Sequence, residues 1–344
     1  MRQTTMKKRT KPLLGVTLGD PAGIGPEVAL RAATTPRVRR AAKVVLLGDT
    51  RIVARACEAV DCDWPVEVFP RDADIRTGAG RVRGRRLAVL DLKGADPKRI
   101  RLGRLSALAG RAAYQWVVAG AQRALAGEID GLVTAPLNKE AVLRAGVKGF
   151  QGHTELLAKM GNTRRFAMML AGGNLRVVLV TTHVAVQKVS RILSPPLILE
   201  KIELTREYLI RLGIPKPRIA VAALNPHGGE GGAFGDEEKQ CIRPAVTRAR
   251  RKGITVVGPL PADTLFAQHV RRPFDAVVVM YHDQGLIPLK LLSFGKGVNI
   301  TLGLPFVRTS PDHGTAFELA GTAAADPGSM IEAVLTAAAL VSRP

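Results

Sequence analysis

Short aliphatic runs alternate with helical segments along nearly the whole chain, and this alternation constrains the fold more than any other feature of the sequence. The first third contains strand-like runs at Leu13–Leu18, Lys43–Leu47 and Val66–Phe69, and helical patterns at 25–33 and 50–60 lie between them. Parallel strands need long crossover connections, and helices usually supply them. The sequence therefore predicts an α/β fold with a mostly parallel sheet and helices on both of its faces.

The same alternation continues to the end of the chain. A long helix is predicted from Ser106, whose hydroxyl is placed as an N-cap, and other helices are predicted at 196–212, 236–252 and 328–341. Hydrophobic residues make up 46% of the 344 residues and aromatic residues only 4%, so the predicted core is aliphatic. The length suits two lobes of about 150–200 residues each. The remaining predicted strands are Leu87–Leu90, Gly131–Thr134, Arg176–Thr182, Ile219–Ala223, Thr255–Val257 and Ala276–Met280.

The chain is strongly basic, with 51 Lys and Arg residues against 29 Asp and Glu residues and a formal net charge of +22. A nucleic-acid surface is one interpretation of this charge. The densest basic stretch is a weak signal for it, because it holds no aromatic residue on which a base could stack. We interpret the charge as solvated surface and expect no nucleic-acid partner. The stretch comprises Arg81, Arg83, Arg85, Arg86, Lys98, Arg99, Arg101 and Arg104.

Cysteine usage and the hydropathy of the chain predict a cytoplasmic protein. Cys57, Cys62 and Cys241 are odd in number and have no paired spacing, so no disulfide framework or cysteine-based zinc site is expected. The segment Met1–Lys11 is basic and lacks the apolar stretch of a signal peptide. No run approaches the roughly 18–20 apolar residues of a membrane helix, so no membrane partner is expected.

Three of the six histidines close segments that begin with predicted strands. They are His183, His227 and His282. The carboxyl ends of parallel strands line the crevice where ligands bind, so three imidazoles delivered to this rim predict a divalent metal site with open positions. Each histidine taken alone is more often a hydrogen-bonded or surface residue. Spacing alone leaves both interpretations open, because the three lie far apart in the sequence.

Several other polar residues are candidates for binding an anion. His153 lies just before a helical pattern in which Thr154 is placed to cap the helix, and a helix start favours anions. Lys290, Asn299 and Arg308 supply hydrogen-bond donors for phosphate or carboxylate. A capping turn and ordinary surface charge are the alternatives. The Gly-rich segment 19–27 matches neither the dinucleotide fingerprint nor a phosphate loop. Its backbone amides could still bind an anion, and a tight structural turn explains the glycines equally well.

Eight colinear segments carry a resemblance to one family. The sequence resembles the 4-hydroxythreonine-4-phosphate dehydrogenases, enzymes of pyridoxal phosphate biosynthesis, over nearly the whole chain. The segments that carry the resemblance are GVTLGDPAGIGPE (15–27), VTAPLNK (133–139), GHTE (152–155), TTH (181–183), LNPHGGEGG (224–232), GPLPADTLF (258–266), YHDQG (281–285) and GVNITLGLPFVRTSPDHGTAFELAG (297–321).

The resemblance implies a two-lobed fold similar to isocitrate and isopropylmalate dehydrogenases, with a cleft between the lobes. The first lobe, 1–140 plus 300–344, is expected to lie on the nucleotide side. The second lobe, 141–299, is expected to hold the metal, the substrate and the dimer interface. The family implies a homodimer whose site takes ligands from both chains. It also implies NAD or NADP as cofactor, and a divalent cation such as Zn, Mg or Co.

The resemblance also implies roles for individual residues. His183, His227 and His282 would hold the metal, and His153, Thr154, Lys290, Asn299 and Arg308 would bind the substrate. Asp312, His313, Gly314 and Thr315 resemble the nucleotide-contacting loop of the wider group, although a helix-capping turn is the alternative. Asp263 and Asp283 would orient histidines or shuttle protons, with Lys290 fixing an anionic end of the substrate. A structural role for either aspartate is the alternative.

The implied reaction is the oxidation of 4-hydroxythreonine 4-phosphate to a β-keto acid that decarboxylates. Pro136–Lys139 resembles the variant in relatives that act on phosphorylated four-carbon acids, so a dehydrogenase of threonate or erythronate phosphate is the alternative. A phosphate acyltransferase on a related fold and a nucleic-acid-binding protein are rival classes. Neither explains the eight segments.

Overall fold

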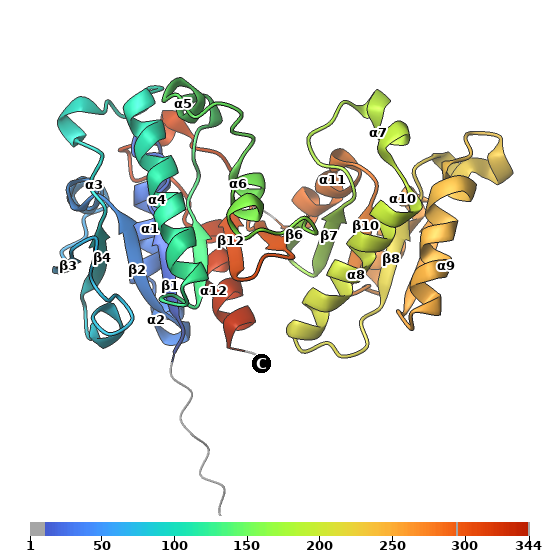
Figure 1. The fold of residues 1–344 in the computed structure, drawn as a ribbon, viewed down its shortest axis with the longest axis horizontal. Helices are drawn as coiled ribbons and strands as arrows, with labels where there is room; N and C mark the ends of the chain where they lie inside the picture. Colours follow the sequence, from blue (N-terminus) through green and yellow to red (C-terminus); the bar gives the residue numbers. More distant parts are fainter. Residues whose placement is uncertain (1–10, 294, 343–344) are drawn as a thin grey trace, which may run out of the picture.

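The computed structural model describes residues 11–293 and 295–342, so residues 1–10 of the basic N-terminal segment lie outside it. Within the described residues twelve strands form one sheet, in the order β3-β4-β2-β1-β5-β12-β11-β6-β7-β10-β8-β9 (Figure 1). The strands are β1 (Leu13–Thr17), β2 (Lys43–Gly48), β3 (Val66–Phe69), β4 (Leu87–Asp91), β5 (Gly131–Thr134), β6 (Ala167–Gly172), β7 (Leu175–Leu179), β8 (Ile219–Ala222), β9 (Val256–Leu260), β10 (Ala276–Val279), β11 (Val298–Leu302) and β12 (Val307–Pro311).

Helices connect most of these strands and cover both faces of the sheet (Figure 1). The α-helices are α1 (Gly25–Thr34), α2 (Pro36–Ala41), α3 (Thr50–Ala59), α4 (Ala107–Leu125), α5 (Lys139–Arg144), α6 (His153–Met160), α7 (Val186–Ile192), α8 (Pro195–Arg211), α9 (Arg243–Arg251), α10 (Ala262–Arg271), α11 (His282–Ser293) and α12 (Gly328–Val341). Shorter helical turns are η1 (Ala79–Arg81), η2 (Pro97–Arg99), η3 (Pro226–Gly232), η4 (Glu238–Ile242) and η5 (Phe317–Leu319).

The predicted α/β fold with a mostly parallel sheet is confirmed. Strands β3, β4, β2, β1, β5 and β12 are parallel to one another, and so are β7, β10, β8 and β9. Between these two blocks, β11 pairs antiparallel with β12 and β6, and β6 pairs antiparallel with β7. The two blocks therefore meet at an antiparallel centre that the strand–helix alternation did not predict.

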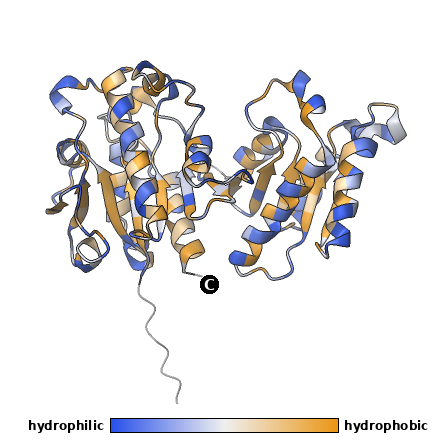
Figure 2. Ribbon diagram, viewed as in Figure 1, coloured by the Kyte–Doolittle hydropathy of each residue, from blue (hydrophilic) through white to orange (hydrophobic). Residues whose placement is uncertain are grey.

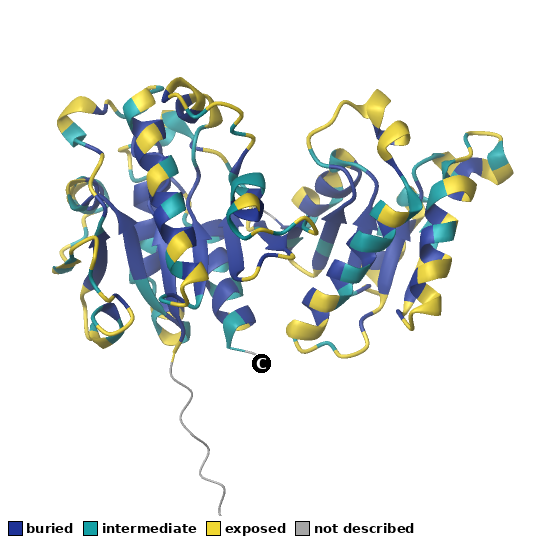
Figure 3. Ribbon diagram, viewed as in Figure 1, coloured by how far each residue is buried: buried dark blue, intermediate teal, exposed yellow. Residues whose placement is uncertain are grey.

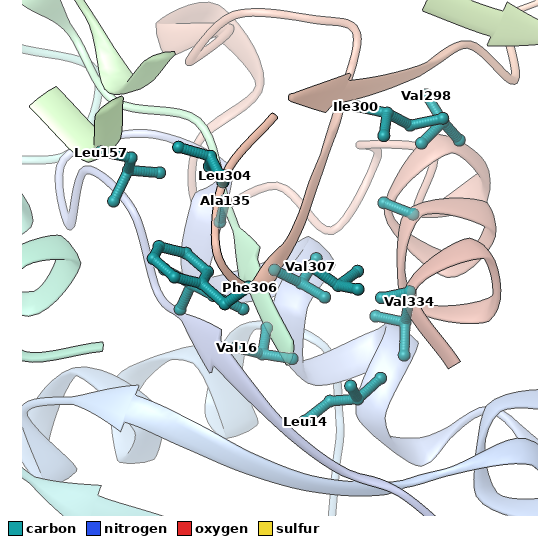
Figure 4. Close-up of a cluster of buried hydrophobic side chains, with 14 of the residues drawn as sticks. Leu14, Val16, Ala135, Leu157, Val298, Ile300, Leu304, Phe306, Val307 and Val334 are labelled. Carbon is teal, nitrogen blue, oxygen red and sulfur yellow. The ribbon is translucent and has the colours of Figure 1, made fainter. Parts of the chain in front are cut away.

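The core is aliphatic, as the composition predicts. The strands of both blocks are mostly hydrophobic and buried, whereas the outer helix faces are hydrophilic and exposed (Figures 2 and 3). Figure 4 shows how the central strands pack: Leu14 and Val16 of β1 lie in one cluster with Phe306, Val307 of β12 and Val334 of α12. None of the described helices is both long and apolar enough to cross a bilayer.

Helix α4 is placed close to the loop that follows β5. Its predicted cap is confirmed, because the Ser106 hydroxyl accepts a hydrogen bond from the Ala109 amide at 3.3 Å. Gly110 lets α4 approach α5, since a Cβ atom at this position would overlap the backbone of Ala141. The close approach fixes the start of α5, where Lys139 borders the cavity described next.

Candidate active site

A cavity of about 360 Å³ lies where the two parallel blocks meet. Its walls come from the end of β5, the start of α6, helix α11, strand β11, and β12 with the loop that follows it. All five residues expected to bind substrate line it, namely His153, Thr154, Lys290, Asn299 and Arg308. His183, His282, Asp312, His313 and Gly314 line it as well. The structure thus brings most of the predicted site residues together from distant parts of the sequence.

Arg308 on β12 is a buried cation with no carboxylate partner among the described residues. Only 2% of its surface is exposed. Its guanidinium donates to the Thr134 hydroxyl at 2.6 Å, through Nη2, and to the Thr301 hydroxyl at 3.1 Å, through Nη1. Burial lowers the pKa of Arg308 to about 10, so the side chain is still charged at neutral pH. A buried charge normally needs a counterion, so this arrangement favours an anionic ligand.

His153 and Asn299 offer further polar atoms to a ligand. The Nε2 atom of His153 and the Oδ1 atom of Asn299 are buried, and neither has a hydrogen-bond partner among the described residues. Burial, together with the cations of Arg308 and Lys139, holds the pKa of His153 well below its usual range. His153 is therefore a neutral hydrogen-bonding group at neutral pH. Unsatisfied buried polar atoms beside a cavity indicate a place for a ligand.

The predicted capping role of Thr154 is wrong. Helix α6 begins at His153 after Gly152, and no side chain caps it. Gly152 has a φ of 156°, and the carboxylate of Glu155 lies close to it. Thr154 thus falls within the first helical turn, where it is buried and lines the cavity. Its position leaves the expectation of substrate contact open.

Two of the three predicted metal ligands lie together. His183 follows β7 and His282 follows β10, and these strands are neighbours in the sheet. The two imidazole centroids are 5.8 Å apart. Burial, with Lys139 and His282 nearby, lowers the pKa of His183, which favours the neutral imidazole that binds metal.

His227 does not join this pair within one chain. It follows β8, but residues His227 to Gly231 all have positive φ, and this backbone directs the segment away from the cavity. The His227 ring is exposed and lies 6.3 Å from the Phe234 ring, measured between centroids. Among the described residues of a single chain, no group of three His, Cys, Asp or Glu side chains could hold a metal ion.

The two aspartates with expected catalytic roles are placed differently. Asp283 accepts a hydrogen bond from Nδ1 of His282 at 2.7 Å, if that nitrogen carries the proton. This bond leaves Nε2 of His282 as the nitrogen available to a metal. Asp263 is exposed on α10 and does not line the cavity. The structure of one chain therefore supports an orienting role for Asp283 and offers none for Asp263.

The loop expected to contact a nucleotide borders the cavity over three of its four residues. Asp312, His313 and Gly314 line it, and the Nε2 atom of His313 is buried without a partner among the described residues. Burial raises the pKa of Asp312, and Lys290, His282 and His313 oppose the shift. Thr315 does not line the cavity; its carbonyl accepts a hydrogen bond from the Ile24 amide at 3.0 Å. Thr315 thus joins this loop to the Gly-rich turn after β1.

Some residues of the site had no role assigned from the sequence. Thr134 and Lys139 fall within the segment 133–139 and Glu155 within 152–155, both of which carry the resemblance. The structure adds that Thr134 holds the Arg308 guanidinium. Asp20 is also new: it is fully buried after β1, and its backbone amide donates to the Pro136 carbonyl at 2.8 Å. This bond fixes the segment that leads to Lys139.

Replacing Asp20 by asparagine is expected to stabilise the fold at pH 8. Burial raises the pKa of Asp20 from 3.8 to about 6, although amide donors partly offset the shift. The folded state therefore binds more protons than the unfolded state between pH 4 and 6, and stability falls as the pH rises through this window. Two pKa units correspond to about 3 kcal/mol. Urea unfolding from pH 4 to 8 tests this, and a constant difference between the two proteins would contradict it.

Comparisons with known proteins assign this chain to a family. The family model of "Pyridoxal phosphate biosynthetic protein PdxA" matches residues 40–337. A 4-hydroxythreonine-4-phosphate dehydrogenase from Desulforapulum autotrophicum is 46% identical over 329 residues, which cover 95% of each protein. A D-threonate 4-phosphate dehydrogenase from Salmonella typhimurium is 44% identical over 317 residues, covering 92% of this chain and 95% of that protein.

A solved structure agrees with these relatives. The crystal structure of a 4-hydroxythreonine-4-phosphate dehydrogenase from Klebsiella pneumoniae aligns with a TM-score of 0.85 and 39% identity, covering 98% of this chain and all of that one. The match therefore covers nearly the whole chain. The chain therefore belongs to the PdxA family of pyridoxal phosphate biosynthetic proteins, whose relatives named above are dehydrogenases.

Proposed function

We propose that the chain oxidises 4-hydroxythreonine 4-phosphate with NAD or NADP, giving a β-keto acid that decarboxylates to 3-amino-2-oxopropyl phosphate. The observation that carries this proposal is the buried Arg308, which forms no ion pair with a carboxylate among the described residues and faces a cavity lined by a pair of histidines. A phosphorylated hydroxy acid would supply the negative charge to pair with Arg308. The names of the relatives supply the class of reaction.

The histidine pair fits a divalent cation such as Zn, Mg or Co. His183 and His282 present two imidazoles to the cavity, and Asp283 orients one of them. We propose that His227 of a second chain completes the set, because within one chain it lies away from the cavity. A bound divalent cation would supply Lewis acidity, which lowers the pKa of the substrate's secondary hydroxyl. The dimer that this requires is part of the proposal.

The other side chains position the substrate and the nucleotide. Arg308 and Lys290 would bind the anionic ends of the substrate, because charged donors form the strongest hydrogen bonds to phosphate and carboxylate. His153 is neutral, so it would contribute a hydrogen bond rather than a charge. The nicotinamide nucleotide would lie against the loop Asp312–Gly314 and accept the hydride from the carbon that bears the hydroxyl. Holding the donor carbon beside the acceptor is the main contribution of these residues.

A dehydrogenase of D-threonate 4-phosphate is the second candidate, because a relative of that name is 44% identical to this chain. The deciding experiment compares both substrates, and erythronate 4-phosphate, with NAD and with NADP. We expect kcat/KM for 4-hydroxythreonine 4-phosphate to exceed the others by about tenfold or more, since about 1.4 kcal/mol is the scale of one net hydrogen bond. A higher value for threonate phosphate would transfer the proposal to the second candidate. Turnover of none of the three would overturn both.

A further inference from the structure

A second cavity, of about 400 Å³, lies at the opposite end of the first parallel block from the active-site cavity. Its walls include the amino ends of β2 and β4, at Lys43 and Leu87, whereas the active-site cavity begins at Thr134, the carboxyl end of β5. Helix α2 and the turn after η1 close its sides. Because β1, β2, β4 and β5 run parallel, the two cavities open at opposite edges of the sheet.

Five cationic side chains line this second cavity, and no described carboxylate does. They are Lys11, Arg39, Lys43, Arg83 and Arg86. None of the five forms an ion pair with a described acidic side chain. Arg85, which lies between two of these residues in the sequence but does not line the cavity, pairs with Asp63 at 2.7 Å. A concentration of one charge within a concave surface attracts ions of the other sign.

Backbone carbonyls hold several of these cations in place without neutralising them. Lys43 donates to the Gly80 carbonyl and Arg39 to the Gly84 carbonyl. Lys11 donates to the Arg39 carbonyl at 2.7 Å, and Arg83 donates to that of Gly80 at 3.0 Å. Burial is the main cause that lowers the pKa of Lys43, and the nearby charges of Arg83 and Lys11 add repulsion in the same direction. An arrangement that keeps like charges together against this repulsion is expected at an anion site.

From this cavity we infer a second ligand site, which binds a small phosphoanhydride such as inorganic polyphosphate or a nucleoside triphosphate. The volume falls within the range of small-molecule sites, roughly 300–1,000 Å³. Five cations exceed what a single phosphate group would need, so a chain of phosphates fits better. The partly exposed Val44 adds an apolar contact at the wall, whereas Leu46 and Leu87 behind it are almost fully buried. The aromatic side chain nearby, Trp64, is covered by Arg39 with its guanidinium 4.6 Å from the ring centroid, which disfavours base stacking by an RNA strand.

The test is isothermal titration calorimetry of the full chain with tripolyphosphate and with ATP. We expect the double variant Arg83→Gln and Arg86→Gln to bind tripolyphosphate at least tenfold more weakly than the original chain. The matched control is Arg99→Gln with Arg101→Gln, which removes the same charge from exposed positions outside the cavity and should leave binding unchanged. Arg83 and Arg86 are exposed, so both double variants should fold, as circular dichroism can verify.

A further comparison separates this site from the active site. Arg308→Met should retain the tripolyphosphate site while losing dehydrogenase activity, and the Arg83 and Arg86 double variant should show the converse. Equal loss of binding in both double variants would show diffuse charge attraction and overturn the inference. Absence of binding to the original chain would overturn it as well. If a 20-nucleotide RNA binds more tightly than tripolyphosphate, and the Arg83 and Arg86 double variant loses this binding, the ligand is a nucleic acid and the inference of a small ligand is wrong.

Discussion

Replacing Arg308 by methionine is expected to lower kcat/KM by a factor of about a hundred to a thousand while leaving the stability of the fold unchanged or higher. Arg308 is 2% exposed and its guanidinium contacts only neutral hydroxyls. The charge of Glu155 offsets the desolvation of Arg308 only in part, without an ion pair to the guanidinium among the described residues, and methionine removes the remaining cost at similar volume. In the complex, however, the same charge would bind the substrate's anionic group, and its loss would cost about 3–4 kcal/mol.

The combination of lost activity and retained stability distinguishes a binding residue from a structural one. Arg308→Lys should restore little of the lost kcat/KM, because a single ammonium group cannot reproduce the contacts that the planar guanidinium makes with Thr134 and Thr301. Arg144→Met is the control: Arg144 is exposed and pairs only with Glu140, four residues before it in α5, so activity should be nearly unchanged. Steady-state kinetics and urea unfolding together make the measurement. A large loss of stability with unchanged kcat/KM would show that Arg308 serves the fold.

The sequence predicts the outer strands well and the centre of the sheet poorly, for a physical reason. Buried parallel strands such as β2 and β10 are continuous aliphatic runs, which periodicity detects. Strands β11 and β12 are not, because they carry the polar side chains Asn299, Thr301 and Arg308 into the core. These residues break the hydrophobic pattern because they belong to the site. The feature that hides β11 and β12 is therefore the one that builds the cavity, whereas β6 is an apolar run that was not predicted and does not share this reason.

The limits of the metal prediction have a different origin. The strand-end rule places His183 and His282 correctly, because β7 and β10 are neighbours and their carboxyl ends share one edge. It places His227 after the next strand, β8, but it cannot foresee the positive φ values from His227 to Gly231. Such backbone is uncommon for residues other than glycine and clusters at functional sites. Sequence reasoning finds the strand that a candidate ligand follows, therefore, and cannot say where the segment after that strand places the side chain.

Mixed dimers test whether two chains share one metal centre. Replacing His227 by alanine in one chain and His183 by alanine in the other should give dimers with about half of the original activity, because one of the two symmetric sites keeps all three imidazoles. Each homodimeric variant alone should lose its metal and at least a hundredfold in turnover, as should the original protein after chelation, since about 3 kcal/mol or more of transition-state stabilisation is removed. Two different affinity tags allow the mixed dimers to be purified, and elemental analysis gives the metal content.

The matched control is a mixed dimer of a His183→Ala chain with a His282→Ala chain. These two histidines line the same cavity of one chain, 5.8 Å apart between centroids, so each site of this dimer would lack one of them and both would be inactive. Recovery in the first pair but not in the second identifies His227 as the ligand contributed across the interface. If the first pair is as inactive as the second, His227 does not complete the partner's centre. The proposal that His227 joins two chains at one metal centre would then be wrong, and because the described residues of one chain offer no group of three ligands, the search would move to other side chains.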